Sequence, residues 1–517
     1  MRNGMMRRFI VVVALLFVAG PVCAEIALPS VIGDHMVLQQ GKKAPIWGWA
    51  SPGEAVTVTM GGKSLSTEAC AKGRWKVVLG RLKAGGPYTM TIAGPNNTIT
   101  VNDILVGEVW VCSGQSNMQW PVSASRDADQ EIAAADYPEI RLFSVERKVA
   151  ETPQEECTAA WSVCTPETVP AFSAVGYFFG RELYQALGVP VGLVHTSWGG
   201  TPSEAWTSLP ALESDPAAKP LLAYWDKVLA DWPETKKTYD AQVDAWKAQV
   251  EKAKAAGKDA PRKPRMPRNP EHPHRPASLY NAMINPLRPF AIQGAIWYQG
   301  ESNAGRAFQY RSLFPLMIED WRAAWGQGDF SFYFVQLANF RERQAEPVED
   351  AWAELREAQT MTLALKNTGM AVIIDIGEAG NIHPKNKQDV GKRLALNALA
   401  KDYGKRIPYS GPMYRSMRRK GNAIVLSFKH AKGGLVAKGG ALKGFAIAGA
   451  NRKFVWADAT IKGKKVVVQS DVVSDPVAVR YAWGTNPACN LYNGADLPAS
   501  PFRTDDWPGI TVSAGTP

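Results

Sequence analysis

The motifs that mark several common enzyme classes are missing from this chain of 517 residues. It contains no glycine-rich dinucleotide turn, no phosphate-binding loop ending in Lys-Ser or Lys-Thr, and no His-Glu-x-x-His helix. These absences argue against nucleotide cofactors and against a zinc-protease centre, so we expect neither a cofactor nor a metal. Histidine is scarce as well, with 6 residues, which leaves few candidates for a general base near neutral pH.

Long apolar runs are also absent beyond the first residues. Near the start, Arg2, Arg7 and Arg8 precede the apolar segment 9–18, which is too short to span a bilayer comfortably. This pattern is typical of a cleaved signal peptide over residues 1–24. We therefore expect a secreted or periplasmic protein with no membrane span.

Neither sign of charge strongly dominates the chain. Loss of the three arginines of the signal peptide lowers the formal net charge from +11 to +8, a modest excess for this length. Part of the excess lies in the proline-rich segment 260–276, APRKPRMPRNPEHPHRP. Basic runs can bind nucleic acid, but a segment so rich in proline is more typical of a solvated connector. We expect no nucleic-acid partner.

Cysteine is sparse, and after signal cleavage an odd number of thiols remains, so at least one is unpaired within the chain. Cys157 and Cys164 are close enough in sequence to form a disulfide in an oxidising compartment, although the sequence does not determine the connectivity. Cys112 lies in an apolar strand and is predicted to be a buried, inert thiol.

Three regions with different patterns divide the remaining sequence. Residues 25–105 read as short strands separated by Pro-Gly and Gly-Gly turns, which predicts a small β-sandwich. In residues 106–404, near-continuous apolar strands alternate with helical stretches, which indicates an α/β domain whose parallel sheet is covered on both faces. Strands and turns return over residues 405–517 and predict a third, β-rich domain.

A helical and proline-rich insertion, residues 209–276, interrupts the middle region. Tyr239, Val243, Trp246 and Val250 are spaced by three or four residues and form one apolar stripe on a helix. We expect this stripe to pack onto the main domain.

Polar residues follow several of the predicted parallel strands. Ser116 follows VWVCS, and the motifs SWGGT (197–201), QGESN (299–303) and NIHP (381–384) follow or lie beyond three other strands. In open parallel sheets, ligands bind at the carboxyl ends of the strands. We therefore expect these loops to converge on one crevice.

A serine hydroxyl in such a crevice becomes a nucleophile only when a base takes its proton. His383 is the one histidine in a loop after a candidate parallel strand. The others fall in the flanking β regions, in an apolar strand or in the proline-rich segment. His383 is therefore the predicted base for Ser116.

Acyl transfer also needs hydrogen-bond donors for the oxyanion that develops in the transition state. Candidates are the backbone amide of Ser116, the glycine turn at Gly199 or Gly200, and a side-chain carboxamide from Gln299 or Asn303. Each is weak evidence alone, but their combination in this order is specific.

Four longer motifs carry a family resemblance: VWVCSGQSNMQWPV, SWGGTPSEAW, IWYQGESNA and IHPKNKQDVGKRLAL. Together they resemble the sialate O-acetylesterase family of carbohydrate esterases, within the SGNH hydrolase superfamily. The resemblance is strong over residues 104–404. The flanking segments resemble the family only in their β-rich character.

The resemblance implies a three-layer α/β/α fold of SGNH type. It also implies that Ser116 is the nucleophile and His383 the general base. Oxyanion donors would be the amides of Ser116 and Gly200 with the carboxamide of Gln299 or Asn303.

One position departs from the family pattern. Relatives often carry an acid two or three residues before the histidine, where this chain has Asn381 and Gly380. Either the site works as a Ser–His dyad, or Asp375 or Glu378 orients the imidazole of His383 from a neighbouring loop.

Two further residues are candidates for substrate binding. Trp198 offers a flat face to a sugar ring, although tryptophan beside a strand more often serves packing. Arg306, just after QGESN, is placed to meet an anionic group such as the carboxylate of sialic acid, with an unliganded helix-surface arginine as the alternative.

The predicted function is hydrolysis of O-acetyl esters on a sugar, with sialic acid as the first choice of substrate. One alternative is the same chemistry on xylan or another acetylated polysaccharide. Another alternative is a non-catalytic carbohydrate-binding protein. The missing acid near His383 is the one sequence feature that supports it.

Overall fold

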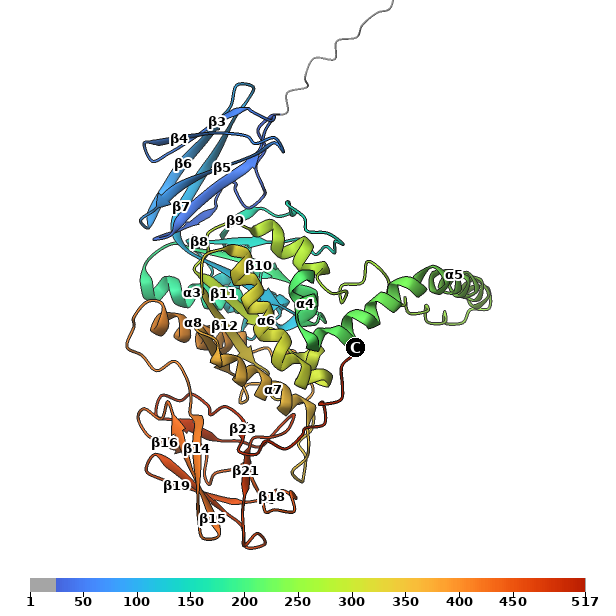
Figure 1. The fold of residues 1–517 in the computed structure, drawn as a ribbon, viewed down its shortest axis with the longest axis vertical. Coiled ribbons are helices and arrows are strands. Elements are labelled where there is room, and N and C mark those ends of the chain that lie inside the picture. The colour runs from blue at the N-terminus through green and yellow to red at the C-terminus, as the bar shows by residue number, and fades with distance from the viewer. Residues whose placement is uncertain (1–24, 517) are drawn as a thin grey trace, which may run out of the picture.

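The computed structural model describes residues 25–516, so the predicted signal peptide lies outside the described residues. A central region of helices and strands separates two β-rich regions, one formed by the first strands and one by the last (Figure 1). Within residues 25–516, no helix combines the length and apolar character needed to cross a membrane.

The central sheet is mostly parallel, as predicted. Its strands are buried because both of their faces are covered, and three of them are buried at every position. Only the last strand at one edge runs antiparallel to its neighbour. The order across the sheet is β13 (Thr368–Val372), β12 (Ser331–Gln336), β11 (Gly294–Tyr298), β7 (Thr98–Gly114), β10 (Val191–Ser197), β8 (Tyr137–Ser144) and β9 (Trp161–Cys164).

Strand β7 lies at the point where the chain changes direction across this sheet. After β7 the chain forms β8 and β9 and returns through β10 on one side of β7, and it then crosses to β11, β12 and β13 on the other side. Such a reversal leaves a crevice beyond the carboxyl end of the strand. Ser116 follows β7 directly and therefore occupies this position.

Helices cover both faces of the sheet. Cys112 of β7 faces helix α3 (Ala174–Leu187), because its sulfur would lie 3.2 Å from a Cβ added at Gly176. Trp297, one register position further along β11, points to the other face, where its ring packs against two aromatic rings of α6 (Ala307–Trp325). Helix α8 (Lys387–Lys401) packs with α3, and α7 (Ala351–Met361) packs with α6.

The N-terminal β region is joined to the central sheet by a single strand. The first half of β7 pairs with β6, and its second half is the middle of the parallel sheet. The boundary expected between residues 105 and 106 therefore falls inside one continuous strand. The other strands of this region are β1 (Val37–Gln39), β2 (Lys43–Trp49), β3 (Ala55–Met60), β4 (Lys63–Glu68), β5 (Arg74–Arg81) and β6 (Gly85–Ala93).

The C-terminal β region has its own apolar core and is fastened to α7. The buried guanidinium of Arg356 donates to the carbonyls of Gly484 and Thr485 at 2.6 and 2.9 Å. The strands of this region are β14 (Met413–Lys420), β15 (Ala423–Lys429), β16 (Leu435–Ala437), β17 (Phe445–Ala448), β18 (Val455–Trp456), β19 (Asp458–Lys462), β20 (Lys465–Gln469), β21 (Ala478–Tyr481), β22 (Leu491–Asn493) and β23 (Phe502–Arg503).

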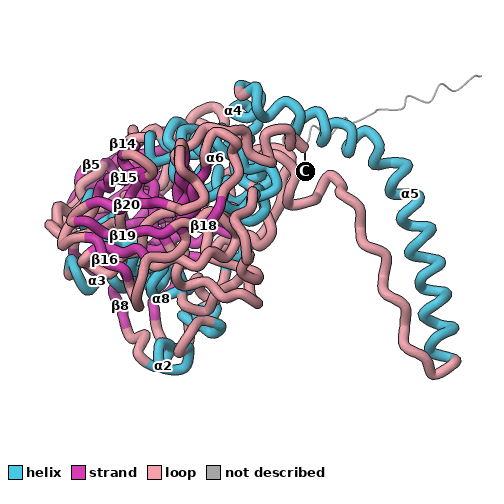
Figure 2. The backbone as a smooth tube through the Cα atoms, turned by 90° about the horizontal axis from the view of Figure 1, so that it is seen from below, coloured by secondary structure: helices cyan, strands magenta, loops and turns pink. Residues whose placement is uncertain are grey.

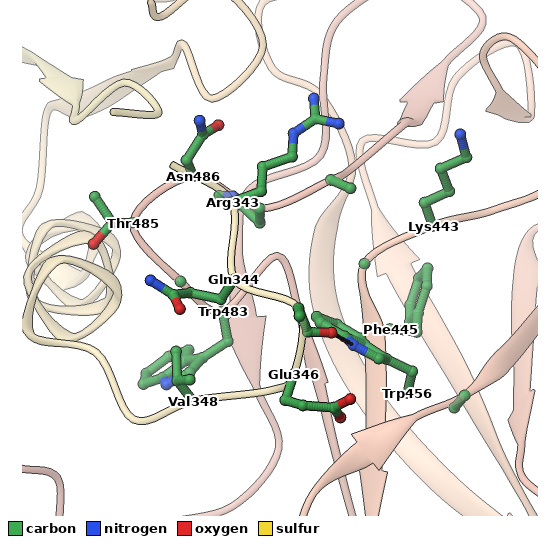
Figure 3. A pocket seen from close by; sticks show the side chains of 16 residues that line it. Arg343, Gln344, Glu346, Val348, Lys443, Phe445, Trp456, Trp483, Thr485 and Asn486 are labelled. Atoms are coloured by element: carbon green, nitrogen blue, oxygen red, sulfur yellow. Dashed lines mark hydrogen bonds between the residues drawn. The ribbon is translucent and has the colours of Figure 1, made fainter. Parts of the chain in front are cut away.

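A cleft of about 340 Å³ marks the border between this β region and the loop that leads into α7. Trp456 and Phe445 line it from the β region, and Glu346 lines it from the loop (Figure 3). The indole of Trp456 donates to the Ala345 carbonyl at 2.6 Å, so the loop and the β region are tied together at the cleft.

The insertion does not pack as expected. Its helices are α4 (Leu209–Ser214) and the 37-residue α5 (Lys219–Ala255), and α5 projects away from the body of the protein (Figure 2). The expectation that its apolar stripe covers the main domain is therefore wrong. One residue of the stripe contacts the returning chain instead: the indole of Trp246 donates to the Pro261 carbonyl at 2.7 Å.

All five cysteines of residues 25–516 are free thiols, so the disulfide considered between Cys157 and Cys164 is not formed. Burial raises the pKa of both thiols to about 12. Cys112 is fully buried, and burial raises the pKa of its thiol well above the ordinary value, as expected for an inert side chain.

Candidate active site

The predicted nucleophile and base lie together, although 267 residues separate them in the sequence. Strand β7 ends at Gly114, whose φ of +142° and close approach to the Tyr298 carbonyl exclude a side chain. The chain then turns into the short helix α1 (Ser116–Gln119). The Oγ atom of Ser116 lies 2.8 Å from Nε2 of His383, within hydrogen-bond distance.

The imidazole of His383 is held by stacking and by its own loop. Its ring stacks on Trp120, with centroids 5.0 Å apart and an interplanar angle of 18°. Its backbone amide donates to Oδ1 of Asn381 at 2.9 Å. Burial, and then the positive charge of Lys387, lower the pKa of His383 below its ordinary value of 6.5. A lowered pKa keeps the imidazole neutral at pH 7, the form that accepts a proton.

The two acids considered as third members of a triad are engaged elsewhere. Both carboxylate oxygens of Asp375 accept from the guanidinium of Arg393, at 2.6 and 2.8 Å. Oε1 of Glu378 accepts from the backbone amide of Lys385 at 2.7 Å. Among residues 25–516, no carboxylate hydrogen-bonds to the imidazole of His383. The geometry corresponds to a Ser–His pair.

A buried polar network lies beneath the pair and links the two loops that carry it. The Nδ2 atom of Asn117 donates to Oε1 of Glu301 at 2.6 Å and to the carbonyl of Ile382 at 3.0 Å. The amine of Lys387 donates to Oδ1 of Asn117. Asn117 follows Ser116, and Ile382 precedes His383. This amide therefore fixes the separation of the two loops.

The charges of this network are strongly perturbed. Burial lowers the pKa of Lys387 to about 7, although the nearby carboxylates of Glu301 and Glu378 act in the opposite direction. Burial likewise raises the pKa of Glu301. Burial removes the water that would stabilise the charged form of each side chain. It therefore lowers the pKa of the lysine and raises the pKa of the glutamate.

Sequence reasoning did not single out Asn117, Glu301 or Lys387. Asn117 and Glu301 lie inside the motifs GQSN and QGESN, and Lys387 lies four residues after His383. The motifs therefore contained the signal, but the hydrogen bonds between them became visible only in the folded chain.

The glycine turn after β10 lies against Ser116. A Cβ added at Gly199 would lie 3.2 Å from the Ser116 Cβ, and the Gly199 amide donates to Oε1 of Gln119 at 2.7 Å. The amides of Ser116 and Gly200 have no acceptor within the described residues 25–516. These two amides are therefore the free donors next to the hydroxyl.

The carboxamides expected as oxyanion donors lie in the interior and are occupied there. The Nε2 atom of Gln299 donates to Oδ1 of Asn303 at 2.6 Å and to the Thr201 carbonyl at 3.3 Å. The Nδ2 atom of Asn303 donates to Glu204 at 2.9 Å. Buried amides must satisfy their donors within the protein. These two side chains brace the loop of Thr201 and Glu204.

Arg306 and Trp198 differ in their surroundings. Arg306 is buried, and its guanidinium forms an ion pair of 2.5 Å with the fully buried Glu204. Arg306 is therefore not placed to meet an anionic substrate. Trp198 is partly exposed beside the glycine turn, and the guanidinium of Arg147 lies 5.8 Å from its ring centroid.

Comparisons with known proteins identify the family of this chain. A sequence model of the family described as carbohydrate esterase, sialic acid-specific acetylesterase, matches residues 106–257 and 270–400. A sialate O-acetylesterase of Mus musculus is 33% identical, covering 92% of this chain and 93% of that protein. One of Homo sapiens is 32% identical, covering 93% of each.

Similarity in three dimensions extends over nearly the whole chain. The crystal structure of a carbohydrate acetylesterase from Xanthomonas citri is 40% identical and has a TM-score of 0.80, covering 93% of this chain and 100% of that one. This chain therefore belongs to the carbohydrate esterase family of sialic acid-specific acetylesterases and is a carboxylic ester hydrolase.

Proposed function

We propose that the protein is a secreted serine esterase that removes O-acetyl groups from carbohydrates, with Ser116 as nucleophile and His383 as general base. The observation that carries this proposal is the distance of 2.8 Å between Ser116 Oγ and His383 Nε2. The free amides of Ser116 and Gly200 beside this pair supply the donors that acyl transfer needs.

In the first half of the reaction, Ser116 Oγ attacks the acetyl carbonyl carbon while its proton passes to Nε2 of His383. The amides of Ser116 and Gly200 donate to the negative oxygen of the tetrahedral intermediate. When the intermediate collapses, the bond to the sugar oxygen breaks, and the imidazolium protonates that oxygen. The sugar alcohol leaves, and Ser116 carries an acetyl ester.

In the second half, His383 takes a proton from a water molecule as the water oxygen attacks the acetyl-serine. Collapse of this second intermediate breaks the ester bond to Ser116 Oγ, which regains its proton from the imidazolium. Acetate is released and the enzyme returns to its starting state.

The pair is proposed to act as a dyad. In place of a carboxylate, stacking on Trp120 and the Asn117–Ile382 hydrogen bond orient the imidazole. An imidazolium without an adjacent carboxylate is less stabilised, so the lowered pKa of His383 is consistent with a dyad.

The fold of the catalytic region is proposed to be the three-layer α/β/α arrangement of SGNH hydrolases. Its parallel sheet, with helices on both faces and Ser116 after the central strand, supports this assignment. Secretion is proposed from the basic and apolar pattern of residues 1–24.

The proposed substrate is O-acetylated sialic acid, since the mammalian relatives are named sialate O-acetylesterases. The Xanthomonas citri protein is described more broadly as a carbohydrate acetylesterase, which favours another acetylated saccharide as second candidate. Acetate release from O-acetylated sialic acid, measured beside acetylated xylo-oligosaccharide, distinguishes the two. Release from neither, by a protein that still binds sugar, would favour the non-catalytic alternative.

A serine-reactive fluorophosphonate tests the nucleophile directly. We expect one adduct on Ser116 of the folded protein, and none on Ser116→Ala or after denaturation. An unlabelled Ser116 in the folded protein would count against the proposed mechanism.

A further inference from the structure

A cavity of about 460 Å³ lies at the base of the insertion, where α5 and the returning proline-rich segment face each other. Tyr224 and Thr235 line it from α5. The returning segment contributes Arg265 and Arg268, together with two histidines. The segment predicted to be a plain solvated connector therefore forms one wall of a basic cavity.

The cavity adjoins the proposed active site through His274. The imidazole of His274 lines the cavity, and burial lowers the pKa of His274 while the backbone of Gly200 beside it acts to raise it. Gly199, the neighbouring residue, lies against Ser116, as the 3.2 Å approach of an added Cβ to the Ser116 Cβ shows. One glycine turn thus touches the nucleophile on one side and the cavity wall on the other.

The arginines of the cavity carry uncompensated charge. Within residues 25–516, neither Arg265 nor Arg268 forms an ion pair with a carboxylate. Asp231 is the one acid in the lining, and it pairs with Lys227 at 3.0 Å. The cavity therefore presents a net positive charge to whatever enters it.

Arg268 is held in place before any ligand binds. Its guanidinium donates to the hydroxyl of Tyr224 and lies 5.3 Å from the Tyr224 ring centroid and 6.0 Å from that of Trp225. A cation stacked on aromatic rings loses little side-chain freedom when it binds an anion, and a guanidinium matches a carboxylate with two parallel hydrogen bonds.

The histidines of the cavity respond to this charge. Burial lowers the pKa of His272 to about 4, and repulsion from His274, Arg268 and Arg265 acts in the same direction. The Nδ1 atom of His272 accepts from the His274 amide at 3.1 Å, so the neutral ring has its Nε2–H donor to offer to a hydroxyl group that flanks a sugar carboxylate.

We propose that this cavity holds the carboxylate of an acidic sugar while an acetyl ester of the same molecule lies at Ser116, with Arg268 and Arg265 as its recognition residues. The inference rests on the proposed function and assigns it an anionic substrate. The matched family model leaves out residues 258–269, so these two arginines are not part of the pattern that the family shares. They take the role that the sequence suggested for Arg306, which is buried against Glu204.

The test compares an acidic substrate with its neutral counterpart. Arg268→Gln and the double variant Arg265→Gln/Arg268→Gln are assayed on O-acetylated sialic acid and on the same compound with its carboxylate converted to the primary amide. We expect KM for the acid to rise about tenfold in Arg268→Gln and further in the double variant, with kcat nearly unchanged. KM for the amide should stay within about twofold of the unmodified protein.

Arg262→Gln is the matched control, since it removes a charge from the same segment but not from the cavity lining. Arg268→Lys keeps the charge without the two-pronged geometry and should recover part of the loss. Equal rises in KM for acid and amide, or an unchanged KM for the acid in the double variant, would overturn the proposal.

Failure of the proposed function gives a different pattern. If Ser116 is not the nucleophile, Ser116→Ala keeps its turnover, whereas the arginine variants still reveal the anion site. Binding of N-acetylneuraminic acid to Ser116→Ala, followed by calorimetry, should weaken about tenfold when Arg268→Gln is added. No loss of binding would count against the cavity alone.

Discussion

The predicted crevice around Ser116 and the cavity at the base of the insertion adjoin the same glycine turn but are built in different ways. Buried hydrogen bonds from several strand ends hold the crevice, and Asn117 is their common partner. One wall of the cavity belongs to the proline-rich segment. This segment returns to the body of the protein after helix α5, which projects from it (Figure 2). Under the two proposals above, the crevice performs the chemistry on the ester, whereas the cavity selects among substrates.

Loss of the nucleophile should have the largest effect in this comparison. Ser116→Ala is expected to lower kcat by about 10³-fold or more for every ester, because no other group can form the acetyl-enzyme. Affinity for an acidic sugar should remain, since the cavity is untouched. Steady-state kinetics with calorimetry measures both, and a simultaneous loss of sugar affinity would break the division between the two regions.

Asn117→Ala should produce the next largest effect. The substitution removes the amide that joins the Ser116 loop to the Ile382 carbonyl and leaves buried Glu301 and Lys387 without this partner. We expect kcat to fall by about 10²-fold with KM little changed, and the free energy of unfolding to fall by about 1–3 kcal/mol.

Kinetics and denaturant unfolding of Asn117→Ala test this expectation, with Asn96→Ala in an exposed turn as the control. A variant that loses stability but keeps the kcat of the unmodified protein would show that Asn117 has no positioning role.

Lys387→Met should change the pH dependence of the reaction. The general base works as neutral imidazole, so activity falls as the pH drops through the pKa of His383, which lies below 6.5. Lys387 is protonated in that range because its own pKa is about 7, and its charge helps to lower the pKa of His383. Without this charge, the acidic limb of kcat/KM should move to higher pH by up to about one unit.

The pH profile of a neutral ester is the measurement for Lys387→Met, with Lys392→Met on the same helix as control. If the acidic limb of the pH profile does not move in Lys387→Met, burial alone sets the pKa of His383.

The smallest effect is expected at the outer part of the insertion. Trp246→Ala removes the hydrogen bond to the Pro261 carbonyl on a partly exposed helix, which should cost about 1 kcal/mol of local stability. Hydrogen exchange should quicken around residues 246 and 261, while kcat for neutral esters stays unchanged. A collapse of kcat would show that the insertion is coupled to the crevice and would remove the distinction between the two regions.

Much of the central region was predictable from local pattern. Near-continuous apolar strands alternating with helices predicted the parallel sheet, and polar motifs after those strands predicted that Ser116 and His383 would meet. These predictions succeed because strand direction brings every carboxyl end to one edge of the sheet, whatever the lengths of the connections. The domain boundary expected at residue 105 was harder to predict, because one unbroken strand belongs to both regions.

The partners of individual polar groups were not predictable in this way. Gln299 and Asn303 lie in a motif that implies oxyanion donors, yet both brace the interior, and Arg306 is buried against Glu204. Asp375 and Glu378 have other partners and leave His383 without a carboxylate. A buried polar atom takes whichever partner the packed chain brings within about 3 Å, and a motif does not specify that partner.

By itself, the sequence determined the periodic features of this protein: the class of the sheet, the segments that reach one edge of it, and the proposed nucleophile and base carried there. Tertiary structure alone decided how these features combine. An apolar stripe on a helix indicates that the helix has a packing partner but does not identify that partner. In the folded chain, Trp246 of this stripe contacts the returning segment of the same insertion. The same return places Arg265 and Arg268 in one cavity with His274, which lies beside Gly200, because contacts between distant segments depend on the path of the whole chain.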